Sequence, residues 1–163
     1  METPSIPQPE VGASFRAAMR RIASTVTIVT ASDESRRHGM TMTAVSSLSM
    51  EPPSMIVCVN QSTFLHDILQ SARGFCVNVL RHDHAAVSTA FSGKATPEER
   101  FLTGDWERNA HGIDFLSDAQ ANIFCQKVAA VPFGTHTIFI GTAVHVRLNE
   151  NASPLLYRNA AYC

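Results

Sequence analysis

The stretch Gly39-Met-Thr-Met-Thr-Ala-Val-Ser-Ser-Leu-Ser-Met-Glu-Pro-Pro53 decides the fold of this chain. It places short hydroxylated side chains on a strand-like run and ends in two prolines. Small side chains leave the backbone open to a flat polar ring, so the stretch predicts a ligand-binding surface. The same alternation is also typical of the solvated face of any antiparallel strand. The residues alone leave both interpretations open.

A buried strand and a second polar cluster follow this stretch. The run Met55-Ile-Val-Cys-Val-Asn60 is apolar and β-branched, which predicts a buried strand. The segment Asn60-Gln-Ser-Thr63 then precedes a helical pattern, and polar groups at the start of a helix favour an anion such as phosphate. The two polar clusters together indicate a ligand with a flat head and an anionic tail.

Length and composition are those of a single globular domain. The chain has 163 residues and a formal charge of -1, which gives no electrostatic reason to expect nucleic acid or an anionic membrane as a partner. No apolar run approaches the roughly 20 residues that span a bilayer. We expect a proline-rich arm over residues 1–13, without the pattern of a signal peptide, and one domain over 14–163 in the cytoplasm. The four cysteines have no CxxC spacing, and three lie in strand-like runs, so we expect buried thiols.

Periodicity predicts a chain dominated by strands. Helical patterns cover residues 15–22, 64–71 and 84–91, with Ser14 as the predicted N-cap of the first and Ser62 or Thr63 as that of the second. Strand patterns cover residues 25–31, 41–49, 55–60, 75–80, 121–131, 137–148 and 155–157. Strands at such close intervals favour a barrel or a sandwich. No G-x-G-x-x-G follows a strand, which argues against a dinucleotide-binding α/β domain.

The role of the segment 94–112 and that of the histidines at 82 and 84 are considered next. The polar segment 94–112 is predicted to be a loop or short helix over a site, with Trp106 either as a core anchor or as a lid. His82 and His84 diverge at i, i+2 and have no evident third ligand, so they do not predict a metal site.

Several short motifs then occur in a fixed order over residues 15–162. They are Gly39-Met-Thr, Thr43-Ala-Val-Ser-Ser-Leu-Ser, Pro52-Pro53, Cys58-Val-Asn60, Ser62, Phe75-Cys-Val-Asn-Val-Leu80, Ser88, Phe91, Gly134-Thr-His-Thr-Ile-Phe-Ile-Gly141 and Pro154-Leu-Leu-Tyr157. In this order the chain resembles the flavin reductase family, the reductase components of two-component monooxygenases. The resemblance implies a mainly β fold with a few helices, the FMN-binding split β-barrel with Greek-key strands, working as a homodimer. It also implies reduction of FMN, with FAD as a further possibility, by NADH or NADPH, and a partner monooxygenase.

The resemblance also assigns site residues. The flavin ring is expected against Thr43, Ala44, Val45, Ser46 and Ser47, and the ribityl chain and phosphate against Asn60, Ser62 and Thr63. Ser88 and Phe91 are expected to close the flavin site from a neighbouring helix, and His136 to lie near the nicotinamide and the flavin ring as the catalytic residue. The family often has an acidic residue where this chain has Thr135.

Two other functions fit the same fold. Some relatives that look like this chain reduce the cobalt of corrin intermediates in cobalamin synthesis. A flavin- or haem-binding module without turnover is the alternative from another class. His136 and the open hydroxyl-bearing strand favour an enzyme over that module.

Overall fold

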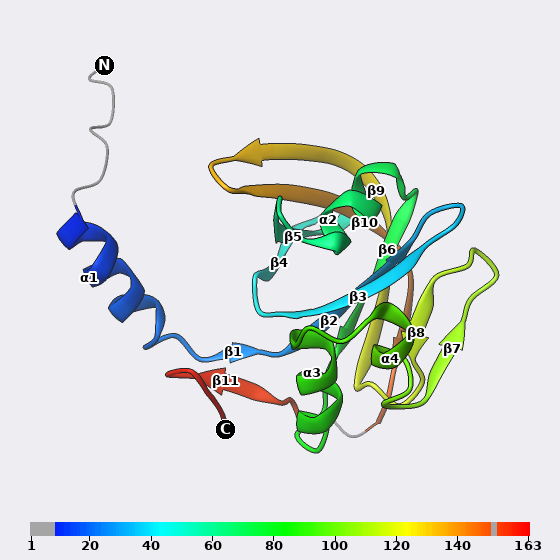
Figure 1. The fold of residues 1–163 in the computed structure, drawn as a ribbon. Helices are drawn as coiled ribbons and strands as arrows, with labels where there is room; N and C mark the ends of the chain where they lie inside the picture. The colour runs from blue at the N-terminus through cyan, green and yellow to red at the C-terminus, as the bar shows by residue number, and fades with distance from the viewer. Residues whose placement is uncertain (1–8, 151–152) are drawn as a thin grey trace.

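The fold is centred on one seven-stranded antiparallel sheet that curls into a split barrel (Figure 1). The computed structural model describes residues 9–150 and 153–163. The order of strands in the sheet is β3-β2-β6-β9-β10-β5-β4. The strands are β2 (Thr27–Ser32), β3 (Arg37–Met42), β4 (Val45–Met50), β5 (Pro53–Asn60), β6 (Gly74–Val79), β9 (Ala121–Phe133) and β10 (His136–Leu148). The consecutive strands β3 and β4 lie at opposite edges, so the sheet is split between them.

The predicted single strand over residues 41–49 is wrong. The chain bends at Thr43 and Ala44, where the Val45 N–H donates to the Thr43 carbonyl at 2.9 Å. The sequence does not signal this bend because neither glycine nor proline, the usual markers of a turn, lies there. The bend is essential to the fold because it carries the chain from one edge of the sheet to the other.

The helix α2 (Phe64–Ser71) fills one end of the barrel. Its residues Leu65, Ile68 and Leu69 are buried in the main core together with Phe75 and Phe139. The Thr63 hydroxyl accepts a hydrogen bond from the His66 N–H at 3.3 Å, which confirms the predicted N-cap.

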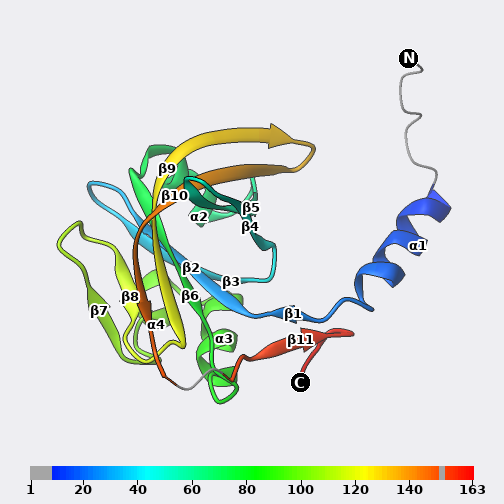
Figure 2. The ribbon, with the colours of Figure 1, turned by 180° about the vertical axis from the view of Figure 1, so that it is seen from behind.

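The first helix differs from its prediction. Helix α1 spans Pro9–Met19, so Ser14 lies inside it and does not cap it. Proline is well suited to the first turn of a helix, where its missing N–H has no partner to lose, and Pro9 begins this one. The predicted boundary at residues 13 and 14 therefore falls within a helix, while residues 1–8 of the predicted arm lie outside the described residues. In both views α1 stands away from the barrel, on the side toward which the β9–β10 hairpin projects (Figures 1 and 2).

A second core lies between the outer helices and the sheet. Helices α3 (Ala85–Ser92) and α4 (Pro97–Arg100) pack here with the hairpin of β7 (Trp106–Arg108) and β8 (Asp114–Leu116). Trp106 lies 4.8 Å from Phe91 and 5.0 Å from Phe101 between ring centroids, and its Nε1 donates to the Thr103 carbonyl. Trp106 is thus a core anchor. A small sheet of β1 (Ser24–Thr25), β11 (Leu156–Arg158) and β12 (Ala161–Tyr162) completes the fold.

All four cysteines are free thiols. Cys76 and Cys125 are buried, and burial raises the pKa of Cys125 to about 12 and that of Cys76 well above its usual range. Neither thiol is therefore ionised at neutral pH. Cys58, the third cysteine expected to be buried, is half-buried, and Cys163 is exposed. Within the described residues no helix has both the length and the apolar character needed to cross a membrane.

Candidate functional site

The edge strand β4 borders an open cavity at the split of the barrel. The cavity has a volume of about 330 Å³ and is lined by Thr43, Val45, Ser46 and Ser47, with Met55, Val77 and Val79 among its apolar residues. Ser46 and Ser47 are exposed, whereas Val45 packs against the main core. Ala44 uses its carbonyl to accept the Cys58 N–H at 2.9 Å, which ties the bend to β5. The result is an apolar floor with hydroxyl groups at its rim.

The turn after β5 is built by its own side chains. The Asn60 Oδ1 accepts hydrogen bonds from the Ser62 N–H at 2.9 Å and the Ser62 hydroxyl at 2.8 Å. The Thr63 hydroxyl donates to the Asn60 carbonyl at 2.8 Å and also caps α2. These contacts fix the turn at the positive end of the α2 dipole, where an anion is stabilised.

His136 lies beside this turn. It is the first residue of β10 and is the register partner of Asn60 in β5. Its Nδ1 is 2.9 Å from the Thr135 hydroxyl, and its carbonyl accepts the Gln61 amide at 3.1 Å. The imidazole is exposed. The Thr135 hydroxyl therefore pairs with one ring nitrogen of His136 and orients the imidazole, while the rest of the imidazole remains accessible to a ligand.

Ser88 and Phe91 lie on α3 and are not among the residues that line the cavity. Both are fully buried, and Phe91 packs in the aromatic cluster with Phe101 and Trp106. Phe91 thus acts as a packing residue, which corrects the expectation that it closes the site. Its proximity to Gly39, where an added Cβ would come within 2.6 Å of the ring, explains why a glycine stands there.

Ser88 connects α3 to β3 and to the small C-terminal sheet. Its carbonyl accepts the Thr41 hydroxyl at 2.7 Å, and its own hydroxyl is 2.8 Å from the Tyr162 hydroxyl. Sequence reasoning missed the roles of Thr41, Tyr162 and Gln61. Gln61 and Thr41 lie inside the two polar segments 60–63 and 39–53, but their partners are fixed only by the tertiary fold.

In the histidine pair at 82 and 84, both ring nitrogens of His84 contact protein groups. His84 is buried, its Nδ1 accepts the Arg81 N–H at 3.3 Å, and its Nε2 is 3.2 Å from an oxygen of Asp118. Across residues 9–150 and 153–163, no group of three or more histidine, cysteine or acidic side chains is arranged to hold a metal.

Four residues of the segment 43–47 line the cavity at β4, while the turn 60–63 and His136 lie together at the end of β5, the strand that pairs with β4. Small hydroxylated residues permit the close approach of a flat ring, and the helix start suits an anionic group. The cavity volume lies within the range of about 300–1,000 Å³ that is usual for small ligands. The residues therefore fit a flavin, with its ring near β4 and its phosphate near the turn.

Comparison with known proteins agrees with this geometry. A reductase component of an FADH(2)-dependent resorcinol hydroxylase from Rhizobium sp. strain MTP-10005 is 54% identical over 94% of this chain and 87% of that relative. The FMN reductase (NADH) RutF of Variovorax paradoxus strain S110 is 37% identical over 92% of this chain and 83% of its own. Among solved structures, the flavin reductase PheA2 superposes with a TM-score of 0.82 at 31% identity, over 93% of this chain and 95% of its own.

The model of one family matches residues 19–163. That match covers the barrel, the turn after β5, the outer helices and the small C-terminal sheet. The chain belongs to the family of the flavin reductase like domain.

Proposed function

We propose that the protein is an NADH-dependent flavin reductase that supplies reduced flavin to a separate monooxygenase. The observation that carries this proposal is the hydroxyl-lined cavity at β4, together with the turn 60–63 and His136 at the end of the neighbouring strand β5. The relatives support it, because one is named an FMN reductase (NADH) and another the reductase component of a hydroxylase. These names favour flavin over a corrin as the electron acceptor. The proposal places the protein in the cytoplasm.

Each segment has a separate task in this proposal. Bound flavin supplies the hydride-accepting chemistry, and the protein supplies binding, orientation and electrostatics. The hydroxyls of Ser46 and Ser47 and the backbone of the segment 43–47 donate hydrogen bonds to the polar edge of the ring, where negative charge develops during reduction. Asn60, Ser62 and Thr63 hold the ribityl chain and the phosphate. His136 holds the nicotinamide against the ring, since hydride transfer requires the reacting atoms about 3–3.5 Å apart.

The reaction itself is tested by mixing the purified protein with NADH and FMN and following the loss of nicotinamide absorbance. We expect turnover that depends on both compounds. Binding of FMN without oxidation of NADH would reduce the protein to a flavin-binding module and would contradict the proposal.

The flavin site is tested by changing Ser47 to leucine. The larger side chain fills the rim of the cavity and removes a donor, and the unpartnered polar group that remains costs about 1–3 kcal/mol, or roughly tenfold or more in affinity for FMN. Fluorescence titration with FMN measures this loss. Leu48→Ser is the matched control, since Leu48 lies on the same strand outside the residues that line the cavity. If Ser47→Leu remains folded and binds FMN as tightly as the unchanged protein, the ring does not lie against β4.

We further propose that the protein is a homodimer. Large apolar side chains are exposed along α1 and just after it (Val11, Phe15, Met19 and Ile22) and along the β9–β10 hairpin (Val128, Val131, Phe133, Val144, Val146 and Leu148). Both elements project from the same side of the barrel (Figure 2). Exposed apolar surface of this extent marks an interaction site, and a two-fold dimer is the commonest solution.

Light scattering at micromolar concentration is expected to give twice the mass of the chain. Phe15→Asp places a charge on the apolar face of α1 and should shift the protein toward the monomer. Ala17→Asp, also exposed on α1, is the control and should remain dimeric. A monomer mass for the unchanged protein would rule out the dimer.

A further inference from the structure

A buried histidine lies on the first turn of α2 and makes a polar contact with β10. His66 is only 8% exposed, and its ring packs edge-on against that of Phe139 with 5.5 Å between the centroids. Its Nε2 is 2.9 Å from the Thr137 hydroxyl and 3.2 Å from the side-chain amide nitrogen of Gln70. Thr137 is 2% exposed, so two buried polar side chains join the helix to the start of the strand.

The donors and acceptors of this contact fit one arrangement. The amide nitrogen of Gln70 can only donate, so the Nε2 of His66 accepts and the ring proton is on Nδ1, which lies 3.9 Å from an oxygen of Asp67. The Thr137 hydroxyl then donates to Nε2, and its oxygen accepts from the side-chain amide of Gln61 at 3.5 Å. The side chains of Gln61, Thr137, His66 and Gln70 thus form a continuous series of hydrogen bonds, the α2–β10 network.

The α2–β10 network reaches the backbone of His136. The same amide nitrogen of Gln61 donates to the His136 carbonyl at 3.1 Å, and the Gln61 N–H donates to the Thr135 carbonyl at 2.9 Å. Successive side chains of a strand point to opposite faces of the sheet, and accordingly Thr137 is buried whereas His136 is exposed. The buried network therefore fixes the stretch of backbone from which the exposed imidazole projects.

The α2–β10 network also belongs to the turn proposed to hold the flavin phosphate. Gln61 lies within the turn 60–63, and the His66 N–H is the group that the Thr63 hydroxyl caps at 3.3 Å. Side chains therefore hold the turn and the start of β10 together, in addition to the strand pairing of Asn60 with His136. A shift of His136 relative to the turn would break these hydrogen bonds.

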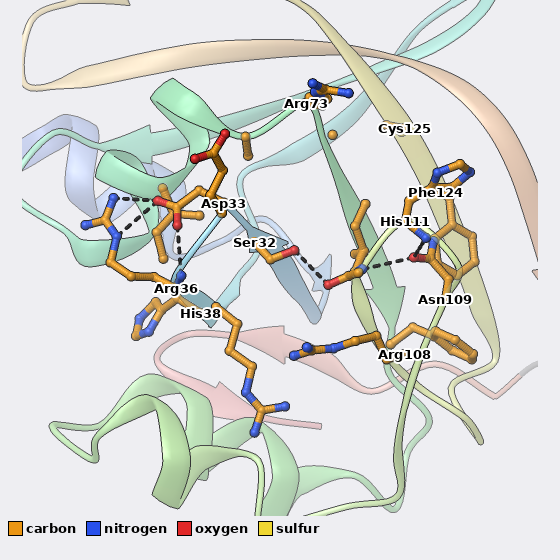
Figure 3. Close-up of a pocket in the computed structure, with 18 of the residues that line it drawn as sticks. Ser32, Asp33, Arg36, His38, Arg73, Arg108, Asn109, His111, Phe124 and Cys125 are labelled. Atoms are coloured by element: carbon orange, nitrogen blue, oxygen red, sulfur yellow. Dashed lines mark hydrogen bonds and ion pairs between the residues drawn. The ribbon is translucent and has the colours of Figure 1, made fainter.

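The network lies apart from the large groove on another face of α2. Figure 3 shows that groove, with Arg73 at its wall, and Phe64, Ile68 and Ser71 are the residues of α2 that line it. None of the four side chains of the network lines that groove or the cavity at β4. A substitution within the network therefore leaves the lining residues of both unchanged.

We propose that Thr137 and His66 are positioning residues for hydride transfer, which act through the backbone of His136. Their contact, extended by Gln61, holds His136 at a fixed place relative to the turn 60–63. This inference rests on the proposed function, because that function places the imidazole of His136 beside the nicotinamide.

Thr137→Val is the test variant, because it keeps the shape of the side chain and removes the hydroxyl alone. Thr137→Ser restores the hydroxyl, and His66→Leu removes the other half of the contact. Thr30→Val is the matched control, since Thr30 is also a buried threonine but lies in β2, outside the network. Its hydroxyl also donates and accepts, to the Asp114 carbonyl at 2.6 Å and from the Asn78 amide at 3.2 Å.

We expect Thr137→Val and His66→Leu to lower the rate constant of flavin reduction at saturating NADH about two- to tenfold, the usual effect of losing one hydrogen bond. Thr137→Ser should recover most of the rate. Thr30→Val should lower the melting temperature, as Thr137→Val does, without slowing reduction. In the His136→Ala protein, Thr137→Val should have no further effect on the rate, because the network acts through that imidazole.

A second measurement needs no turnover. The imidazole signal of His136 in carbon-13 NMR spectra, identified by its absence in His136→Ala, should move in Thr137→Val and stay in place in Thr30→Val. An unmoved signal, a rate no lower than that of Thr30→Val, or equal slowing with and without His136 would overturn the proposal. The proposed function fails separately, if the unchanged protein binds FMN without oxidising NADH. In that case the NMR signal still decides whether the network positions His136.

Discussion

Replacing His136 with alanine is expected to slow flavin reduction by NADH about ten- to a hundredfold. The loss follows from removing one positioning hydrogen bond of about 1.5–3 kcal/mol at the step of hydride transfer. The variant should retain its fold, because the imidazole is exposed and its hydrogen-bond partner within the described residues is the Thr135 hydroxyl. It should also retain FMN, since the proposed flavin contacts come from β4 and the turn 60–63.

Anaerobic stopped-flow kinetics measure the rate of flavin reduction, and a melting curve measures whether the fold is retained. Thr135→Val is the informative companion, because it removes the hydroxyl that orients the ring but leaves the imidazole in place. It should slow reduction less than His136→Ala, and Thr135→Ser should restore the rate. An unchanged rate constant at saturating NADH in His136→Ala, together with an earlier melting transition, would show that the imidazole only stabilises the turn.

The sequence predicts the strongly periodic elements well. The helix at 64–71 and its Thr63 cap are confirmed, because an amphipathic run, a capping hydroxyl and a following glycine agree with one another. The long strands at 121–131 and 137–148 are also confirmed as the arms of the β9–β10 hairpin. The ordered motifs predicted the family, which the match over residues 19–163 confirms.

Features that depend on tertiary contacts were not predictable in the same way. The bend at Thr43 has no local marker, and the hydrogen bond that ties it to β5, from the Cys58 N–H to the Ala44 carbonyl, forms only when β4 lies beside β5. A phenylalanine such as Phe91 looks the same in the sequence whether it faces a ligand or the core. Only the packing of Phe101 and Trp106 around it shows that it belongs to the core. The roles of the hydroxyl groups in β4 remain predictions, to be tested by Ser47→Leu.

The burial of Arg100 could not be predicted either, because nothing in the sequence marks an arginine near a short helix as buried. It is 8% exposed, and its guanidinium donates to the carbonyls of Ala95, Gly39, Phe91 and Gly93. No ion pair is found for it within residues 9–150 and 153–163. Its charge is instead stabilised by carbonyl oxygens, including those at the end of α3, where the helix dipole favours a cation. Arg100 thus fastens the segment 93–100 and α3 to β3.

Replacing Arg100 with methionine is therefore expected to lower the free energy of unfolding by about 3 kcal/mol or more. Methionine fills similar space but leaves the carbonyls of Gly39 and Phe91, which are buried, without their donor, and each buried unsatisfied group costs about 1–3 kcal/mol. Denaturant unfolding at a fixed protein concentration measures the loss, since a dimer makes stability depend on concentration. The free energy of unfolding of Arg100→Lys should lie between those of Arg100→Met and the unchanged protein, because an ammonium group keeps the charge but cannot reproduce the planar fork of donors. Arg158→Met, at an exposed position, should stay within about 0.5 kcal/mol of the unchanged protein. A value for Arg100→Met as small as that control would mean that water replaces the guanidinium without loss, and that Arg100 does not fasten α3 to the sheet.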